Sequence, residues 1–322
     1  MSAKSSRKER YERAETILVP GATRMQGGAM IDTLLGVEAP VKVRALVRDS
    51  SSPAAQALAE REVQLVEGSF FEGQAIRSAL AGADGVFSMQ MPPNPSDRED
   101  LESEARVARI LMDAAAAAGV ETVVHTSVAR AGDHEQFTGW SEGRWWEPYW
   151  INKAAANDAV RAAAVEHRVI LEPAMMMENL LPSEEFMFPG LSRRGELVSA
   201  MDPDTRMDYI SAADAGRFAA AAFLDCARFA GHEIDLASDS LTLAEVADTI
   251  AGVTGASMRA RHASAEEALA AGAFHGAVSS QRWQTDEGYQ VDLRKAASWG
   301  VEPCRFADRA TAHRFDFVVG AA

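Results

Sequence analysis

Short apolar runs alternate with helix-like segments along the first half of the chain, and this alternation constrains the fold more than any other feature. The runs are four to seven residues long and rich in Val and Ile, whereas the intervening segments have the length and spacing of helices. Because the runs are apolar almost throughout, helices must cover both faces of the sheet that they form. We therefore predict an α/β fold with a doubly wound parallel sheet of the Rossmann type. The predicted strands are 16–19, 41–47, 63–66, 85–89, 122–127 and 169–172, and the predicted helices are 27–35, 53–60, 74–80, 97–118 and 149–166.

The alternation loosens after about Pro173, which suggests a second structural unit. We interpret residues 16–173 as a dinucleotide-binding Rossmann domain. Residues 174–322 are expected to form a smaller C-terminal α/β substrate lobe, interleaved with the last strands of the sheet. Residues 1–15 are charged, lack an apolar core and are interpreted as a disordered leader. Within the lobe we predict helices 212–225 and 243–254 and a strand 233–236.

The charge of the chain excludes several classes of partner. It has 32 basic and 47 acidic residues, a formal net charge of −15 at pH 7. Such a surface repels nucleic-acid backbones and anionic lipids, so we expect neither a nucleic acid nor a membrane as partner. Because no apolar run is long enough to span a membrane and no secretory signal is seen, we expect a cytoplasmic protein. Cys226, Cys304 and seven scattered His have no metal-ligand spacing, and we expect no metal site.

A glycine-containing turn, Gly21–Gly28, follows the first predicted strand and precedes a helix. In dinucleotide-binding folds this turn lets backbone amides approach a pyrophosphate, and the helix N-terminus adds partial positive charge. The alternative is a plain tight turn. The expected cofactor-binding residues here are Gly21, Thr23, Arg24, Met25, Gln26 and Gly27.

The end of the second strand indicates which nicotinamide cofactor is bound. A basic residue at this point favours the 2′-phosphate of NADP(H), whereas a carboxylate favours the ribose of NAD(H). Arg48 stands at the strand end, and Ser50 and Ser51 can donate to phosphate oxygens. Asp49 keeps NAD(H) open as an alternative, and Arg48 could also be a solvated charge. We predict NADP(H), with Met89, at the end of the fourth strand, also touching the cofactor.

Tyr149 and Lys153 are the candidate catalytic pair. Their i, i+4 spacing places the phenol and the ammonium on one helical face, where the ammonium is expected to lower the phenol pKa. A carbonyl that receives a hydride needs a proton donor at its oxygen, and Tyr149 can serve. Ser127, at the end of the fifth strand, could hydrogen-bond the same oxygen, and Lys153 could also hold the cofactor ribose. The alternative for each is a surface or packing residue.

Three further features lie near this predicted site. His125 shares a sheet face with Ser127 and is interpreted as a core histidine rather than a catalytic one. Residues 175–177 are all Met, which suits either a substrate pocket or core packing. The segment Trp140–Trp150 holds four of the six Trp and is interpreted either as a lid over a flat apolar ligand or as a subunit interface, such as that of a homodimer.

Several motifs together resemble the NmrA-like family of atypical short-chain dehydrogenases/reductases. This resemblance implies a Rossmann domain, a preference for NADP(H), and either reductase activity or a redox-sensing role without turnover. Ser127, Tyr149 and Lys153 also resemble the Ser, Tyr and Lys of the wider short-chain reductase superfamily. The motifs are Ile17–Thr23, Val43–Asp49, Ala83–Phe87, Thr126–Ala129, Met176–Asn179 and Asp208–Gly216.

Three positions depart from the family pattern. Arg24 replaces the middle glycine of the turn and either crowds the pyrophosphate or pairs with it. Ser69 stands where the family usually has an Asp near the adenine, and Glu172 replaces a usual Arg.

The sequence as a whole predicts an NADP(H)-dependent reductase of a small, aromatic or quinone-like carbonyl compound. The alternative, favoured by Arg24, Ser69 and Glu172, is an NADP(H) sensor that acts through a protein partner without chemistry. A third interpretation is a scaffold without cofactor, which would follow if Arg24 blocked the turn.

Overall fold

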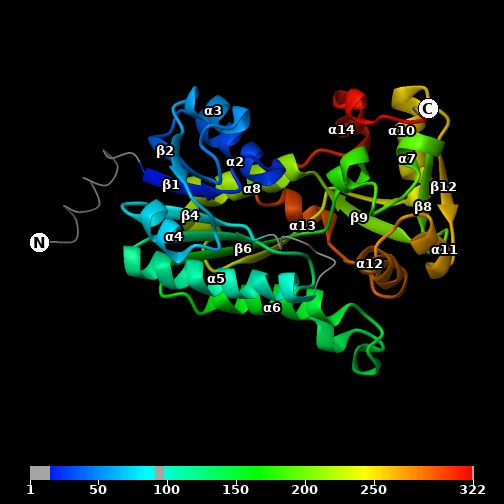
Figure 1. The fold of residues 1–322 in the computed structure, drawn as a ribbon, viewed down its shortest axis with the longest axis horizontal. Helices are drawn as coiled ribbons and strands as arrows, with labels where there is room; N and C mark the ends of the chain where they lie inside the picture. Colours follow the sequence, from blue (N-terminus) through cyan, green and yellow to red (C-terminus); the bar gives the residue numbers. More distant parts are fainter. Residues whose placement is uncertain (1–14, 91–97, 321–322) are drawn as a thin grey trace, which may run out of the picture.

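Seven short strands pair side by side in parallel, as the alternating apolar runs predict (Figure 1). The structure is a computed structural model that describes residues 15–90 and 98–320. The strand order in the sheet is β10-β6-β5-β4-β1-β2-β3. From β1 the chain adds β2 and β3 on one side, and from β4 onwards it adds strands on the other side, so the doubly wound fold is confirmed. The predicted leader lies outside the described residues except for Glu15, which begins β1. The strands are β1 (Glu15–Pro20), β2 (Val41–Val47), β3 (Gln64–Glu67), β4 (Gly85–Ser88), β5 (Thr122–Thr126), β6 (His167–Pro173) and β10 (Glu233–Leu236).

Helices cover both faces of this sheet, which explains why its strands are apolar on both sides (Figure 1). One apolar cluster lies between the sheet and a first layer of helices, and a second cluster lies between the sheet and the opposite layer. The first layer contains α2 (Met25–Gly36), α3 (Pro53–Ala59) and α8 (Ala212–Leu224), with α9 (Cys226–Phe229) and α13 (Leu293–Ala297) beside it; the opposite layer contains α4 (Gly73–Leu80), α5 (Arg98–Ala118) and α6 (Glu147–Arg161).

Helix α8 packs unusually close to α2, the helix that follows the glycine turn. A Cβ atom added at Gly216 would lie 2.7 Å from the backbone nitrogen of Met30 and 2.8 Å from the carbonyl oxygen of Gln26. Real Cβ atoms do not approach so closely, and glycine is therefore required. This contact fixes α2 laterally, against its neighbour in the same helical layer.

The second half of the molecule has its own apolar core and two small sheets (right half of Figure 1). Although β10 and α8 come from residues beyond 173, they belong to the large sheet and its helical layer, so the chain crosses between the halves more than once. No helix in residues 15–90 or 98–320 is long and apolar enough to cross a bilayer. The strands are β7 (Met175–Met176), β9 (Arg206–Ile210) and β11 (Asp239–Thr242) in one sheet and β8 (Glu196–Ser199) and β12 (Arg259–His262) in the other; the helices are α7 (Leu191–Arg194), α10 (Leu243–Thr254), α11 (Ala265–Ala270), α12 (His275–Asp286) and α14 (Phe306–Ala312).

Two helices differ from their predicted limits by more than one residue, and one of them, α6, begins at Glu147, two residues before its predicted start. Helix α6 ends at Arg161 rather than at residue 166, because the chain turns there so that the amide of His167 can bond the Glu121 carbonyl oxygen at 2.8 Å and start β6. Helix α2 begins at Met25, two residues before the predicted start. The earlier start brings the helix N-terminus into the glycine turn.

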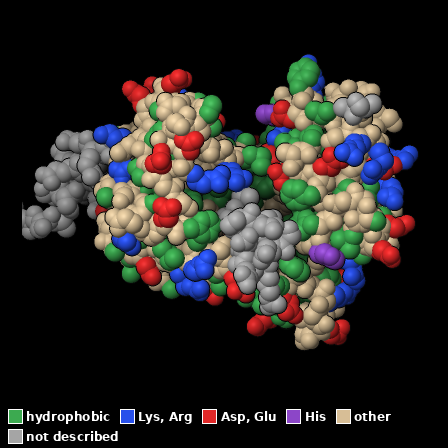
Figure 2. Space-filling view, in the orientation of Figure 1, with side chains coloured by type: hydrophobic (Ala, Val, Ile, Leu, Met, Phe, Trp, Pro, Cys, Tyr) green, Lys and Arg blue, Asp and Glu red, His purple; other side chains and the backbone are tan. Residues whose placement is uncertain are grey.

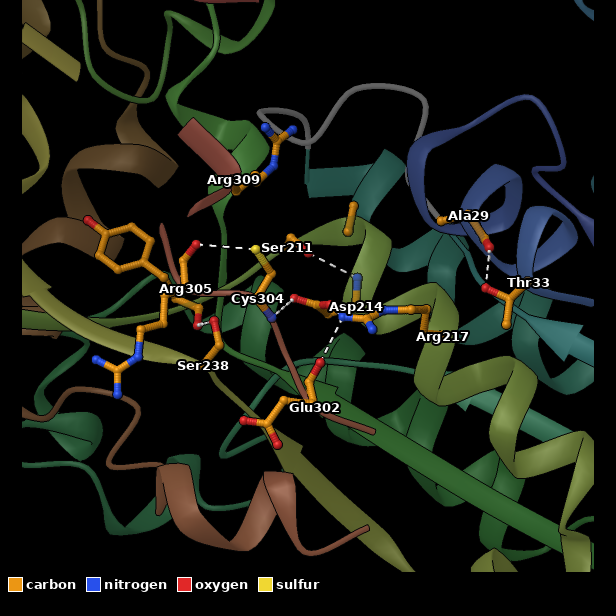
Figure 3. Close-up of polar contacts among 12 residues, drawn as sticks. Ala29, Thr33, Ser211, Asp214, Arg217, Ser238, Glu302, Cys304, Arg305 and Arg309 are labelled. Carbon is orange, nitrogen blue, oxygen red and sulfur yellow. Dashed lines mark hydrogen bonds and ion pairs between the residues drawn. The ribbon is translucent and has the colours of Figure 1, made fainter. Parts of the chain in front are cut away.

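A polar joint connects the two halves at the start of α8 (Figure 3). The Asp214 carboxylate accepts a hydrogen bond from the Cys304 amide at 2.9 Å and pairs with Arg217. Arg217 in turn donates to the Glu302 carbonyl oxygen at 2.9 Å. The segment that leads into α14 is thus held against the helical layer of the large sheet.

Glu178 provides a second connection at the same joint. Its buried carboxylate accepts hydrogen bonds from the Ala212 amide at 2.8 Å and from Nε of Arg309, on α14, at 2.8 Å. The two motifs that contain Glu178 and Asp214 therefore position the halves relative to each other.

Candidate functional site

The turn after β1 has the geometry of an anion-binding loop. Gly21 has a φ of +63°, and its carbonyl oxygen accepts the Arg24 amide at 2.8 Å. A Cβ atom at Gly27 would lie 2.4 Å from the same oxygen, so glycine is needed at both positions. The amides of Met25, Gln26 and Gly27, in the first turn of α2, have no intrahelical acceptor and carry the positive end of the helix dipole.

Two contacts fix this loop to the rest of the site. The Thr126 hydroxyl, at the end of β5, donates to Oε1 of Gln26 at 3.0 Å. The buried side chain of Met89 packs against the loop, because its terminal methyl would lie only 2.4 Å from a Cβ atom at Gly21. Thr23 is exposed at the tip of the turn.

Arg24 lies at the N-cap of α2 with its side chain in solvent. This side chain makes no hydrogen bond or ion pair to another residue in 15–90 or 98–320. Its guanidinium nevertheless acts on Glu184 of the other half: burial raises the pKa of Glu184 and the charge of Arg24 lowers it. The glycine turn and Glu184 therefore face the same space, and Figure 2 shows that the surface is notched between the two halves.

The end of β2 combines one free cation with two carboxylates. Arg48 is exposed and makes no hydrogen bond or ion pair to a described residue. The amide and hydroxyl of Ser50, a predicted phosphate donor, instead donate to Oε2 of Glu67 at 3.0 and 2.5 Å. Ser51 donates to Asp49 in the same way. These bonds lower the pKa of Glu67 and of Asp49, so both carboxylates are ionised beside Arg48.

Tyr149 and Lys153 lie side by side on α6, as their spacing predicts. Nζ of Lys153 is 5.8 Å from the centre of the Tyr149 ring. The ammonium also pairs with Glu104, whose Oε1 lies 2.5 Å from Nζ and whose side chain is 2% exposed. Glu104 belongs to α5 and was not identified from the sequence. The sequence does indicate a buried carboxylate here, because Glu104 precedes Ala108 and Leu111 at helical spacing and thus occupies a core-facing position.

The electrostatics at Tyr149 are the opposite of those expected. Burial and the charge of Glu104 raise the pKa of the phenol, so the prediction that Lys153 lowers it is wrong. The physical reason is first the burial of the phenol and then the Glu104 carboxylate, whose charge opposes that of the ammonium. Tyr149 is consequently a weak acid in this structure.

Ser127 and His125 lie at the end of β5. Ser127 is buried, its amide bonds the Leu171 carbonyl oxygen at 2.8 Å, and its hydroxyl has no partner among the described residues. His125 is fully buried with Nδ1 3.0 Å from the Ser88 hydroxyl, and burial lowers its pKa to about 3. His125 is therefore a neutral core residue, as interpreted from the sequence.

A cavity of about 280 Å³ opens beside Tyr149. Trp146, Tyr149 and Trp150, from the Trp-rich segment, line it together with Met175, whereas Met177 is buried in the core. Among the described residues that line the cavity, Glu184 is the only charged one. The remaining lining residues are Asn179, Phe186, Met187, Phe274, Gly276, Ala277, Ser279, Ser280 and Tyr289.

Comparison with known proteins gives a family-level match. The model of the NmrA-like family matches residues 13–297. The oxidoreductase FrzB of Cladobotryum sp, named as containing an NmrA-like domain, is 34% identical over 113 residues, which are 34% of this chain and 33% of FrzB. The chain thus spans about a third of the length of this relative. The similarly named malD of Malbranchea aurantiaca is 27% identical over 76% of this chain and 74% of its own.

Solved structures share the fold. The triphenylmethane reductase of Citrobacter sp. has a TM-score of 0.73 at 19% identity, over 92% of this chain and 99% of the reductase. The NADPH-dependent quinone oxidoreductase QOR2 of Escherichia coli, solved with NADPH, has a TM-score of 0.71 at 19% identity, over 93% of this chain and 99% of QOR2. NmrA, a negative transcriptional regulator solved with NADP, has a TM-score of 0.71 at 19% identity, over 94% of this chain and 95% of NmrA.

Proposed function

The chain belongs to the NmrA-like family, and on this premise we propose that it is an NADP(H)-dependent reductase of small aromatic or quinone-like carbonyl compounds. The observation that carries the proposal is the cavity of about 280 Å³, which has aromatic walls and contains Tyr149. A flat aromatic molecule fits such walls, and Tyr149 supplies a hydroxyl at the point where a carbonyl oxygen would be protonated.

The residues around the glycine turn fit the phosphates of a dinucleotide. The first-turn amides of α2 and the loop Gly21–Gly27 would hold the pyrophosphate. Arg48, which is free and exposed, would pair with the 2′-phosphate, and Ser50 would have to turn away from Glu67 to join it. Lys153 uses one of its three donors for Glu104, and a second one would bond the ribose.

In the proposed reaction the nicotinamide supplies the hydride, and the protein supplies the proton. The Tyr149 phenol donates its proton to the carbonyl oxygen, and the unpartnered hydroxyl of Ser127 bonds the same oxygen. Because the pKa of Tyr149 is raised, forming the phenolate costs free energy here, and the phenol must regain a proton after each transfer. Because Glu104 compensates its charge, we assign Lys153 to the cofactor ribose and not to lowering the pKa of the phenol.

The ion pair of Lys153 with Glu104 also favours a second candidate function. Since Glu104 compensates Lys153 and raises the pKa of Tyr149, the site also suits a protein that binds NADP(H) without turning it over. NmrA, whose structure shares the fold, is described as a regulator. Such a protein would report the cofactor to a protein partner.

The test begins with calorimetric titration of NADPH and NADH. The reductase proposal predicts tighter binding of NADPH and loss of reduced nicotinamide absorbance with a panel of quinones and aromatic aldehydes. The Tyr149→Phe variant should bind NADPH as the wild type does and lose most of the turnover of carbonyl substrates. Binding of NADPH without turnover of any substrate would favour the sensor, and no binding of either cofactor would refute both functions.

A further inference from the structure

The cavity beside Tyr149 has one charged group, and that group is negative. Glu184 is half-buried at the cavity, and its carboxylate makes no hydrogen bond or ion pair to another described residue. Among the described lining residues there is no Lys, Arg or His. An anionic ligand would therefore be repelled by the only charge that lines the described part of the cavity, whereas a cationic ligand would be attracted.

The walls of the cavity favour a cation for an independent reason. Its aromatic lining residues include Trp146, Trp150, Phe274 and Tyr289. The faces of such rings carry negative potential and attract cations, with Trp the most effective of them. Several rings around one carboxylate form the arrangement by which proteins recognise quaternary nitrogen.

The cations near the cavity do not cancel this preference. Lys153, behind Tyr149, is compensated by the buried carboxylate of Glu104 at 2.5 Å. Arg24 lies on the glycine turn with its side chain in solvent and forms no ion pair with Glu184, and its charge offsets only part of the effect by which burial raises the pKa of Glu184. The net charge of −15 adds a field that draws cations towards the protein.

We propose that the cavity selects flat aromatic cations, such as N-alkylated heteroaromatic or iminium compounds, over neutral molecules of the same shape. The proposal rests on the assignment of this cavity as the substrate pocket, and it adds a substrate class that the carbonyl reaction does not include. When a reduced nicotinamide transfers a hydride to such a cation, one C–H bond forms at the cationic system. The substrate becomes neutral, the nicotinamide becomes the cation, and no proton is consumed.

A reaction that takes up no proton suits the groups around the cavity. Carbonyl reduction takes up one proton for each hydride and therefore depends on a phenol that is a weak acid here. Reduction of a cation makes no such demand. A proton donor is thus needed for carbonyl substrates, but it is not required for cationic ones.

The test measures binding without cofactor, by calorimetry at pH 7.5. The ligands are the N-methylquinolinium cation and neutral quinoline, which share the same fused rings. The wild type should bind the cation about tenfold more tightly than quinoline. The Glu184→Gln variant keeps the shape of the side chain, and it should lose most of this preference by binding the cation more weakly. The control Glu60→Gln removes the same charge from an exposed position at the end of α3 and should behave as the wild type.

The outcomes separate this inference from the proposed function. Equal affinity for the two ligands, no binding of either, or a preference that survives Glu184→Gln would overturn cation selection. If quinones are still reduced in that case, the reductase proposal stands and only the substrate class is wrong. If NADPH does not bind at all, the reductase proposal fails whatever the result with quinolinium. As a second readout, a pH indicator in weak buffer should record proton uptake with quinones and none with the cation.

Discussion

Replacing Glu172 by Gln should stabilise the protein, and more so at higher pH. Glu172 is 8% exposed on β6 and accepts a hydrogen bond from Nδ2 of Asn157 at 2.9 Å. Burial raises its pKa to about 8, with further contributions from Asp235 and Glu233 on β10, while Arg161 and the Asn157 bond oppose the shift. A Gln side chain keeps the oxygen that Asn157 contacts and removes the buried charge.

The sign and the size follow from proton linkage. The unfolded chain releases the Glu172 proton near pH 4.5, whereas the folded chain holds it up to about pH 8. Stability from this group is therefore fully present below pH 4.5 and is lost as the pH rises towards 8. The full interval corresponds to about 5 kcal/mol. Because Glu172 lines a cavity together with Arg130, whose charge is near, we expect about 2–4 kcal/mol in practice.

The assay is urea unfolding of the wild type and of Glu172→Gln at pH 6.0 and pH 8.5, with Glu60→Gln as the exposed control. The free energy of unfolding of the variant should exceed that of the wild type by about 1–2 kcal/mol at pH 6.0 and by about 2–4 kcal/mol at pH 8.5. The difference between the two proteins thus has to grow with pH. Parallel pH profiles would refute the reasoning, because they would mean that Glu172 titrates in the folded protein as it does in the unfolded chain.

Three further substitutions test the glycine turn, the phosphate selectivity and the buried ion pair. Gly27→Ala places a Cβ atom against the Gly21 carbonyl oxygen, and calorimetry should show NADPH binding at least about tenfold weaker; unchanged affinity would exclude this loop from the cofactor site. Glu67→Gln removes a carboxylate beside Arg48 and should tighten NADPH binding about threefold or more without affecting NADH, whereas an equal change for both would remove Glu67 from the phosphate site. Lys153→Met leaves Glu104 buried without its partner and should lower the free energy of urea unfolding by about 3 kcal/mol. The additional change Glu104→Gln should restore most of this loss, whereas additive losses in the double variant would contradict the pairing.

The large sheet could be predicted because burial on both faces determines the sequence pattern of its strands directly. A strand covered on both faces must be apolar at nearly every position, and the runs at β1, β2, β4 and β5 satisfy this rule within one or two residues. The chain order of such runs and helices then leaves few topologies. The small sheets escaped prediction because β11 and β12 are short and only half-buried, so their sequences carry no such pattern.

The candidate site shows the same division between local and long-range information. The turn Gly21–Gly27 follows from neighbouring residues, because helix start, positive φ and close backbone approach are all local properties. The partners of Ser50 are not local. Glu67 reaches Ser50 only because β2 pairs with β3 in a register that places Val47 opposite Glu67. That register is a property of the folded sheet, which explains why a serine expected to bind phosphate instead binds a carboxylate.

The pair Tyr149 and Lys153 shows why the chemistry of a site can differ from its geometry. Their spacing on α6 fixes their proximity, whatever surrounds them. The acidity of the phenol, however, depends on the charge in the low-dielectric space next to it, and that charge is set by Glu104 on the neighbouring helix α5. Since α5 and α6 pack along one face of the sheet, a residue 49 positions earlier adds to the effect of burial in making the phenol a weaker acid. Burial and one carboxylate from the neighbouring helix therefore make the same Tyr and Lys a weaker proton donor than their spacing alone predicts.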